Sequence, residues 1–273
     1  RGSFRSFQIL CPNNRRGHPN VWRDRRQRDG QGWGDDGGEA AQAAVLPVLS
    51  LYAEGCYADR TDDAWLSERM KACTGESYED FLLLDLPNLT PDNPCPGRVS
   101  VGPAKYLLYQ DALLGIYDRH VDEETFPAHF AAAASQLQQA ALRSGRYGYL
   151  FGALSALCSA LEVKCDLGVR LVRAYEAGDN GALKELADRA GEAPGKAQEF
   201  RQAVRAQWFP ENRPFGWEVL DVRLGGVKAR LESAKWRVTD YLEGRAARLE
   251  ELEEPRLLLD ERDNPGHRTL PLS

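Results

Sequence analysis

Several motifs of well-characterised enzyme classes are missing from this chain of 273 residues. It contains no GxxxxGK(S/T) phosphate-binding loop, no GxSxG nucleophile turn and no HExxH helix. These absences exclude a P-loop nucleotide site, a serine nucleophile of the α/β-hydrolase type and a zincin-type metal centre.

Cysteine and histidine are sparse, and neither has the spacing of a metal site. The six cysteines include no CxxC pair, and the four histidines lie far apart in the sequence. We therefore predict no metal site and no cofactor. Cys158 and Cys165 are seven residues apart in a helical pattern, which places them on one face of a helix. We interpret them as buried free thiols of a protein in a reducing, cytoplasmic compartment.

Long hydrophobic runs are also missing. No apolar stretch approaches the roughly 18 residues of a membrane-spanning helix, and the first residues lack the apolar core of about 7–15 residues that a signal peptide needs. We expect no membrane association. Because the chain begins with Arg1 and contains a single methionine, Met70, we expect a fragment of a longer product.

Positive charge is concentrated at the start of an otherwise acidic chain. The net charge is −6, yet residues 1–32 contain eight arginines and two aspartates. This stretch shows no sustained hydrophobic period and is predicted to be disordered. An arginine-rich arm can bind nucleic acid, but no recognition motif accompanies it, and we expect no nucleic-acid partner.

The remaining pattern is helical. Apolar residues recur at helical spacing from Asp62 onward, without alternating strand patterns or repeats of 20–50 residues. The predicted fold class is mainly all-α, with a helical C-terminal domain at 61–254 and a tail at 255–273. The expected helices span 40–54, 62–75, 77–84, 105–118, 127–142, 147–177, 182–208 (interrupted at Pro194-Gly195) and 217–252.

An aromatic segment separates the last two long helical patterns. It reads WFPENRPFGW over residues 208–217, where Pro210, Pro214 and Gly216 are expected to break the preceding helix. Each large ring buries roughly 150–250 Å² when it packs. We interpret the segment as a packing corner between two helices.

Three groups of residues are candidates for chemistry. Trp33-Gly34-Asp35 combines an indole that can stack on a sugar ring with a carboxylate that can bind two adjacent hydroxyls, although an ordinary turn reads the same way. The pairs Asp122-Glu123 and Asp260-Glu261 are adjacent acids in polar surroundings. Paired carboxylates do acid–base work only where burial or neighbours separate their pKa values, so we interpret both pairs as helix-capping or solvated residues.

Four blocks in order resemble one known family. They are WGDDGGE at 33–39, VLPVLSLYAE at 45–54, KYLLYQDALLG at 105–115, and ENRPFGWEVLDVRLGG at 211–226. They are similar to segments of β-N-acetylhexosaminidases of glycoside hydrolase family 20 that have a (β/α)₈ barrel followed by an all-helical domain. On this resemblance, residues 33–60 are a remnant of the barrel's end, comprising its last turn and helix.

The resemblance implies an exo-acting enzyme that releases terminal β-linked GlcNAc or GalNAc by a substrate-assisted, retaining mechanism, in which the sugar's own acetamido group attacks the anomeric carbon. Trp33 would then line the sugar subsite, Asp35 would bind hydroxyls, and Glu39 is a further substrate-binding candidate. The catalytic Asp-Glu pair of the family follows an earlier barrel strand, so no catalytic residue is expected in this chain and the fragment is expected to be inactive. The expected partners are an amino-sugar glycoside and a second copy in a homodimer. The alternative is a non-catalytic, all-helical interaction or scaffolding domain.

Overall fold

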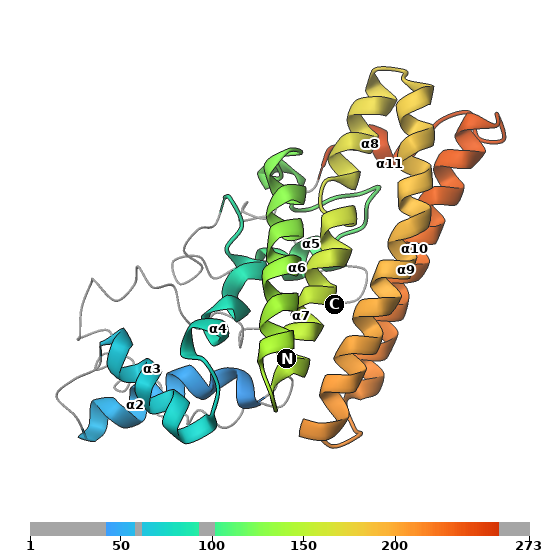
Figure 1. Ribbon diagram of the computed structural model, residues 1–273. Helices are drawn as coiled ribbons and strands as arrows, with labels where there is room; N and C mark the ends of the chain where they lie inside the picture. Colours follow the sequence, from blue (N-terminus) through green and yellow to red (C-terminus); the bar gives the residue numbers. More distant parts are fainter. Residues whose placement is uncertain (1–41, 58–61, 93–101, 257–273) are drawn as a thin grey trace, which may run out of the picture.

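The computed structural model describes residues 42–57, 62–92 and 102–256. All regular structure within these ranges is helical, as predicted (Figure 1). The basic stretch 1–32 and nearly all of the tail at 255–273 lie outside the described residues, as do Trp33 to Ala41 of the expected barrel remnant.

Short helices form one end of the molecule. Asp62 begins α3 by accepting a hydrogen bond from the backbone N–H of Trp65 at 2.9 Å, and Gly75 ends the helix with φ +79°, both as the sequence predicts. Glu54 of α2 accepts hydrogen bonds from the indole of Trp65 and from Arg69, which ties α2 to α3. The elements are η4 (Gln42–Val45), α2 (Leu46–Tyr57), α3 (Asp63–Thr74), α4 (Tyr78–Leu82) and η5 (Leu83–Asn88).

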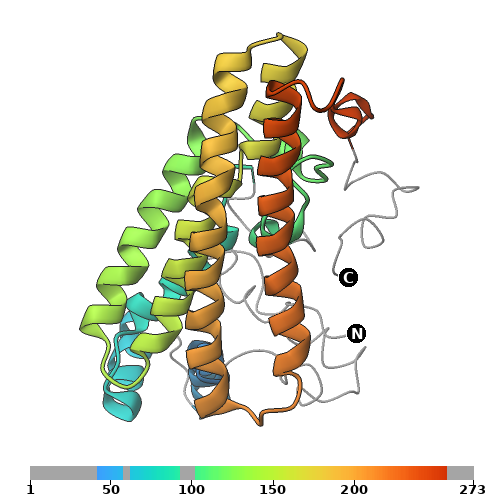
Figure 2. The ribbon, with the colours of Figure 1, turned by 90° about the vertical axis from the view of Figure 1, so that its right-hand side faces the viewer.

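Four longer helices form the body. The antiparallel pair α6 and α7 packs beside the antiparallel hairpin of α9 and α10, and α7 contacts α9 (Figure 1). Figure 2 shows α9 and α10 side by side over nearly their full length, on one side of the molecule. The bounds are α5 (Pro103–Tyr109), η7 (Asp118–His120), α6 (Thr125–Arg143), α7 (Gly148–Lys164), α8 (Leu167–Glu176), α9 (Asn180–Glu211), α10 (Trp217–Leu242) and α11 (Glu250–Glu253).

One long helix replaces the helical pair expected at 182–208. Pro194 lies inside α9 and is buried there, and Pro210 lies in its last turn. A proline removes one backbone hydrogen bond, but Ala190, Ala193 and Ala197 pack this stretch closely into the core. Tertiary packing therefore maintains the helix through a residue that usually interrupts one.

The aromatic corner forms as predicted, but only part of it is buried. Trp208 is buried, and its indole donates a hydrogen bond to the carbonyl of Arg213 at 2.8 Å. The Trp217 ring lies 6.3 Å from that of Trp208 and 6.0 Å from that of Phe209. Phe209 is 42% exposed and Phe215 is 84% exposed, so the two tryptophans supply most of the packing in this corner.

Three expected helices are shorter than predicted. The helix expected over 105–118 ends at Tyr109, and residues 110–117 form a buried, non-helical loop. The helix expected over 147–177 is divided into α7 and α8 by a turn at Cys165-Asp166. The helix expected over 217–252 ends at Leu242, and a turn with Gly244 at φ +73° leads to α11.

Candidate functional site

The densest group of buried polar side chains surrounds the loop at 110–118. Gln110 and Asp111 are both buried. The side-chain oxygen of Gln110 accepts hydrogen bonds from the backbone N–H groups of Ile116 and Tyr117, at 3.2 and 2.9 Å, and Asp111 accepts one from Leu113 at 2.9 Å. These side chains satisfy backbone donors that a helix would otherwise satisfy, so the loop is ordered without regular structure.

Lys164, at the end of α7, holds the beginning of the loop through backbone carbonyls. Its ammonium is buried and donates to the carbonyl oxygens of Leu107 and Gln110, at 2.6 and 2.7 Å. Burial lowers its pKa to about 8, against the opposing effect of Asp111 and Asp118. The positive charge therefore lies where the last carbonyls of α5 carry partial negative charge.

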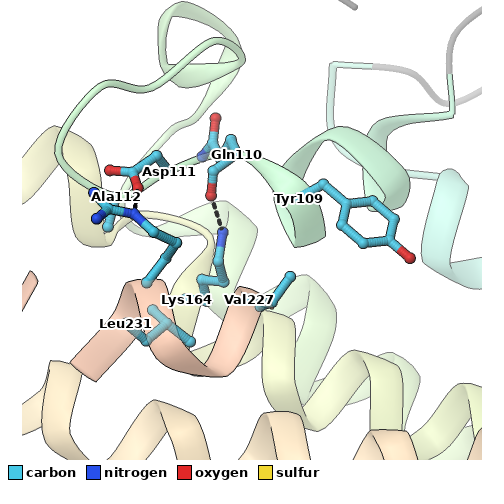
Figure 3. A pocket seen from close by; sticks show the side chains of 8 residues that line it. Tyr109, Gln110, Asp111, Ala112, Lys164, Val227 and Leu231 are labelled. Atoms are coloured by element: carbon cyan, nitrogen blue, oxygen red, sulfur yellow. Dashed lines mark hydrogen bonds and ion pairs between the residues drawn. The ribbon is translucent and has the colours of Figure 1, made fainter. Parts of the chain in front are cut away.

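Arg230 of α10 holds the loop from the side. It forms an ion pair with Asp111 at 2.6 Å, and the Asp111 side chain is only 2% exposed. Figure 3 shows Lys164 pointing toward Gln110, with Asp111 on the side nearer α10. The hollow between these residues has a volume of about 10 Å³, which is room for about one water molecule. A ligand pocket is typically about 300 Å³ or larger, so this hollow does not fit a sugar.

Asp118 and Arg256 form a second buried pair at the far end of the loop. Their closest atoms, Oδ2 and Nε, are 3.2 Å apart. Arg256 also donates to the carbonyls of Leu113 and Gly168. Burial raises the pKa of Asp118, opposed by Arg256 and Lys164, and burial lowers the pKa of Arg256. The C-terminal arm of the described chain is thereby fastened to the loop.

A third charged group fixes the turn between α7 and α8. The Asp166 carboxylate is fully buried and pairs with Arg170 and Arg189, each at 2.5 Å. The adjacent Cys165 is a free, buried thiol, and burial raises its pKa to about 12. Cys158 is also free and buried, as predicted for both residues. A thiol with a raised pKa is a poor nucleophile.

The loop is therefore held by a clamp of side chains, which consists of Lys164, Arg230 and Arg256 with their partners Gln110, Asp111 and Asp118. Each of the buried charges described above has an ion-pair or hydrogen-bond partner. Removing one partner from such a group leaves an uncompensated buried charge, which is strongly destabilising. The role of the clamp is structural: it holds the loop rigidly, with Leu114 at its exposed tip.

The adjacent acids at 122–123 have structural partners. Asp122 accepts hydrogen bonds from the backbone N–H and the hydroxyl of Thr125 and from the backbone N–H of Glu124, at the start of α6, and these bonds lower its pKa. Glu123 forms ion pairs with Arg170 and Arg173. The capping interpretation of Asp122 is confirmed, whereas Asp260-Glu261 lies outside the described residues.

The predicted substrate-binding residues Trp33, Asp35 and Glu39 also lie outside the described residues. The helix that follows them is described, and Ala44 at its beginning belongs to the same hydrophobic core as the bundle. No cluster of three or more potential metal ligands occurs in the part of the chain that the structure describes. Among the same residues, no helix has the length and apolarity needed to cross a membrane.

A family comparison identifies the fold. The family model for the glycoside hydrolase 20C C-terminal domain matches residues 79–270, from α4 through the whole bundle. The chain belongs to this family. No curated protein gave a match. The predicted family is thus confirmed through its C-terminal domain, whereas the blocks at 33–39 and 45–54 lie outside the matched residues and stay predictions.

Sequence reasoning missed the residues that hold the loop at 110–118 in this helical domain. Lys164 and Asp111 were assigned to helices as ordinary members of apolar patterns, and Arg230 and Arg256 were not singled out. The available signal was a charged residue inside an otherwise apolar stretch: Asp111 follows KYLLYQ, and Lys164 ends the apolar run of α7. A charge in such a position is rarely buried without a partner.

Proposed function

We propose that this chain is part of an exo-acting β-N-acetylhexosaminidase that releases terminal β-linked GlcNAc or GalNAc. The single observation that supports the proposal is the family membership of residues 79–270, because that C-terminal domain belongs to glycoside hydrolases of family 20. The proposed reaction is substrate-assisted and retaining: the acetamido oxygen of the sugar forms the bond to C1 as the aglycone leaves, and water then opens the oxazolinium intermediate. The catalytic Asp-Glu pair is proposed to come from a barrel that these 273 residues do not include.

The proposed contribution of this chain to the sugar site is the turn at 33–39. Trp33 would stack on the apolar face of the sugar, and Asp35 would accept hydrogen bonds from two of its hydroxyls. Glu39 is a further substrate contact in this proposal. The helix after the turn, α2, is tied to α3 through Glu54 and Trp65, which supports the idea that the helical domain braces the turn.

The decisive experiment uses an enzyme that contains both the barrel and this chain. Release of nitrophenol from the β-GlcNAc and β-GalNAc glycosides should be measured for the parent and for Asp35→Ala. Loss of a charge-assisted contact to two hydroxyls should lower kcat/KM by at least about 100-fold. Asp36→Ala removes the same charge one residue away and should change kcat/KM by less than about threefold, as expected for a side chain outside the subsite.

A second measurement tests the mechanism. A thiazoline analogue of the oxazolinium intermediate should inhibit far more strongly than GlcNAc itself, because intermediate-like compounds bind more tightly than substrates or products. Equal activity of Asp35→Ala and parent would refute the subsite assignment. An enzyme inactive on both glycosides would instead favour the non-catalytic interaction domain.

A further inference from the structure

The arm that follows α11 is anchored in the loop at 110–118 by one side chain. Glu254 and Pro255 are exposed, whereas the side chain of Arg256 is only 19% exposed. Its guanidinium donates hydrogen bonds to the backbone carbonyl of Leu113 in the loop and to that of Gly168 in the first turn of α8, the latter at 2.9 Å. Arg256 therefore joins three segments that are far apart in the sequence.

The acceptors around Arg256 match a guanidinium group. The Asp118 carboxylate lies 3.2 Å from the Nε of Arg256, and its side chain is only 6% exposed. Together with the carbonyls of Ala112, Leu113 and Gly168, it presents oxygen atoms that only accept hydrogen bonds. A guanidinium has five N–H donors in a fixed plane, whereas an ammonium donates from one atom. The site should therefore discriminate between these two cations.

Two glycines allow the backbone to approach the carboxylate closely. A Cβ on Gly168 would lie 2.8 Å from the carbonyl oxygen of Ala112 and 3.0 Å from the Oδ2 of Asp118. A Cβ on Gly115 would lie 2.4 Å from the same Oδ2. Because alanine has the higher helix propensity, the glycine in the first turn of α8 is explained by this close approach. The site is thus lined by backbone on two sides.

We propose that these oxygens form a binding site for a guanidinium group, and that the arm is a strap that fills the site with Arg256. The site recognises the group and not the chain that carries it, so a free alkylguanidinium cation fills the site when the Arg256 side chain is removed. Occupancy of the site orders the loop, because without it the buried Asp118 carboxylate loses its ion-pair partner. The proposal concerns the helical domain alone and does not depend on the glycosidase assignment.

Chemical rescue tests the site. Arg256→Ala removes the atoms of one ethylguanidinium ion, so adding ethylguanidinium to the full Arg256→Ala chain should restore the contact. Thermal unfolding should show a saturable rise in Tm of about 3–5 °C at about ten times the Kd. The parent should show no such rise, because Arg256 fills its site. Ethylammonium, which has the same charge without the planar donors, is the matched control. No rise with ethylguanidinium, or an equal rise with ethylammonium, would overturn the proposal.

Hydrogen exchange separates the site from the strap. The backbone N–H groups of Ile116 and Tyr117 report on the loop, and that of Glu254, which donates to the carbonyl of Glu250 at 3.2 Å, reports on the arm. All three should exchange faster in Arg256→Ala than in the parent, and ethylguanidinium should slow exchange only in the loop, by about tenfold. Slower exchange in both segments would show general stabilisation, and slower exchange in neither would show that the cation does not bind. Either result overturns the proposal.

Arg256→Lys provides the test if Arg256→Ala does not fold. It keeps a positive charge near Asp118, but one ammonium does not replace the separate donors to Leu113 and Gly168. The loop amides of this variant should exchange about tenfold faster than those of the parent. Exchange at the parent's rate would show that a positive charge alone is enough, and the site would then not be specific for a guanidinium group.

Discussion

The Lys164 ammonium lies 2.7 Å from the carbonyl oxygen of Gln110, and the side chain of the same Gln110 accepts two backbone N–H groups further along the loop. One buried lysine and one buried glutamine thereby connect the end of α5, the loop and the end of α7. The loop that interrupts the strongly apolar segment after Lys105 is thus held by polar contacts. Its stability should depend on the charge of Lys164.

We expect Lys164→Met to change how stability varies with pH. The pKa of Lys164 is lowered from 10.5 in the unfolded chain to about 8 in the fold. Between these values the unfolded state binds more protons, so the contribution of Lys164 to the free energy of unfolding rises with pH, by at most about 3 kcal/mol. Below pH 8 both states are protonated and the contribution is constant.

The measurement is urea unfolding of both chains at pH 7.5, 9 and 10. Cysteines and tyrosines also titrate in this window, so the informative quantity is the free energy of unfolding of the parent minus that of Lys164→Met. This difference should increase with pH. Lys184→Met, at an exposed position of α9, is the control. A difference that is flat from pH 7.5 to 10 would contradict the lowered pKa.

The ion pair between Asp111 and Arg230 should show energetic coupling. Arg230→Gln leaves the Asp111 carboxylate buried without its main partner and should destabilise by about 2 kcal/mol, less than a fully buried pair because the arginine is partly exposed. In the Arg230→Gln variant, Asp111→Asn should lower the free energy of unfolding by less than it does in the parent. A double-mutant cycle by denaturant unfolding should give a coupling of about 1–2 kcal/mol, and additive effects would show that the contact contributes nothing.

Local signals predicted the fold where they act alone. The beginning of α3 at Asp62 and its end at Gly75 follow from capping rules, and the Ala-rich pattern of α6 predicted that helix to within a few residues. These features depend on neighbours in the sequence. The same holds for the family assignment, which came from ordered blocks of residues.

The predicted helix boundaries were wrong where residues distant in the sequence determine the backbone conformation. Residues 110–117 have a helical apolar pattern, but their backbone groups are paired by side chains. Lys164 donates to the carbonyls of Leu107 and Gln110, and the Gln110 side chain accepts from two N–H groups of the loop. The turn at Cys165-Asp166 contains no proline or glycine; the two arginines that hold Asp166 come from α8 and α9. Neither interaction is visible in a single stretch of sequence.

The beginning of α9 allows a test of how much a helix cap stabilises this protein. Asp179 accepts a hydrogen bond from the backbone N–H of Ala182 at 2.9 Å. Asp179→Ala should lower the free energy of unfolding by about 1 kcal/mol, while Asp179→Asn keeps an acceptor and should cost only a few tenths. Asp188→Ala removes the same charge from an exposed position within α9 and should have little effect. Equal losses for Asp179→Ala and Asp188→Ala would attribute the effect to net charge.

Two glycines with nearly the same backbone angle separate strain from crowding. Gly115 has φ +63° and Gly178 has φ +65°, a region that residues with a Cβ rarely adopt. A Cβ at Gly178 would meet nothing within 4 Å, whereas one at Gly115 would lie 2.4 Å from the carboxylate oxygen of Asp118. Gly178→Ala should therefore cost about 1 kcal/mol from the backbone alone.

Gly115→Ala should cost more, about 2–4 kcal/mol, because the Cβ also displaces the buried carboxylate that pairs with Arg256. Denaturant unfolding of both variants gives the comparison directly. In Gly115→Ala with Asp118→Ala the clash is removed, so the added cost of the Gly115 change should fall toward that at Gly178. If Gly115→Ala costs no more than Gly178→Ala in the parent chain, the carboxylate is free to move, and the loop is not held by its pair with Arg256.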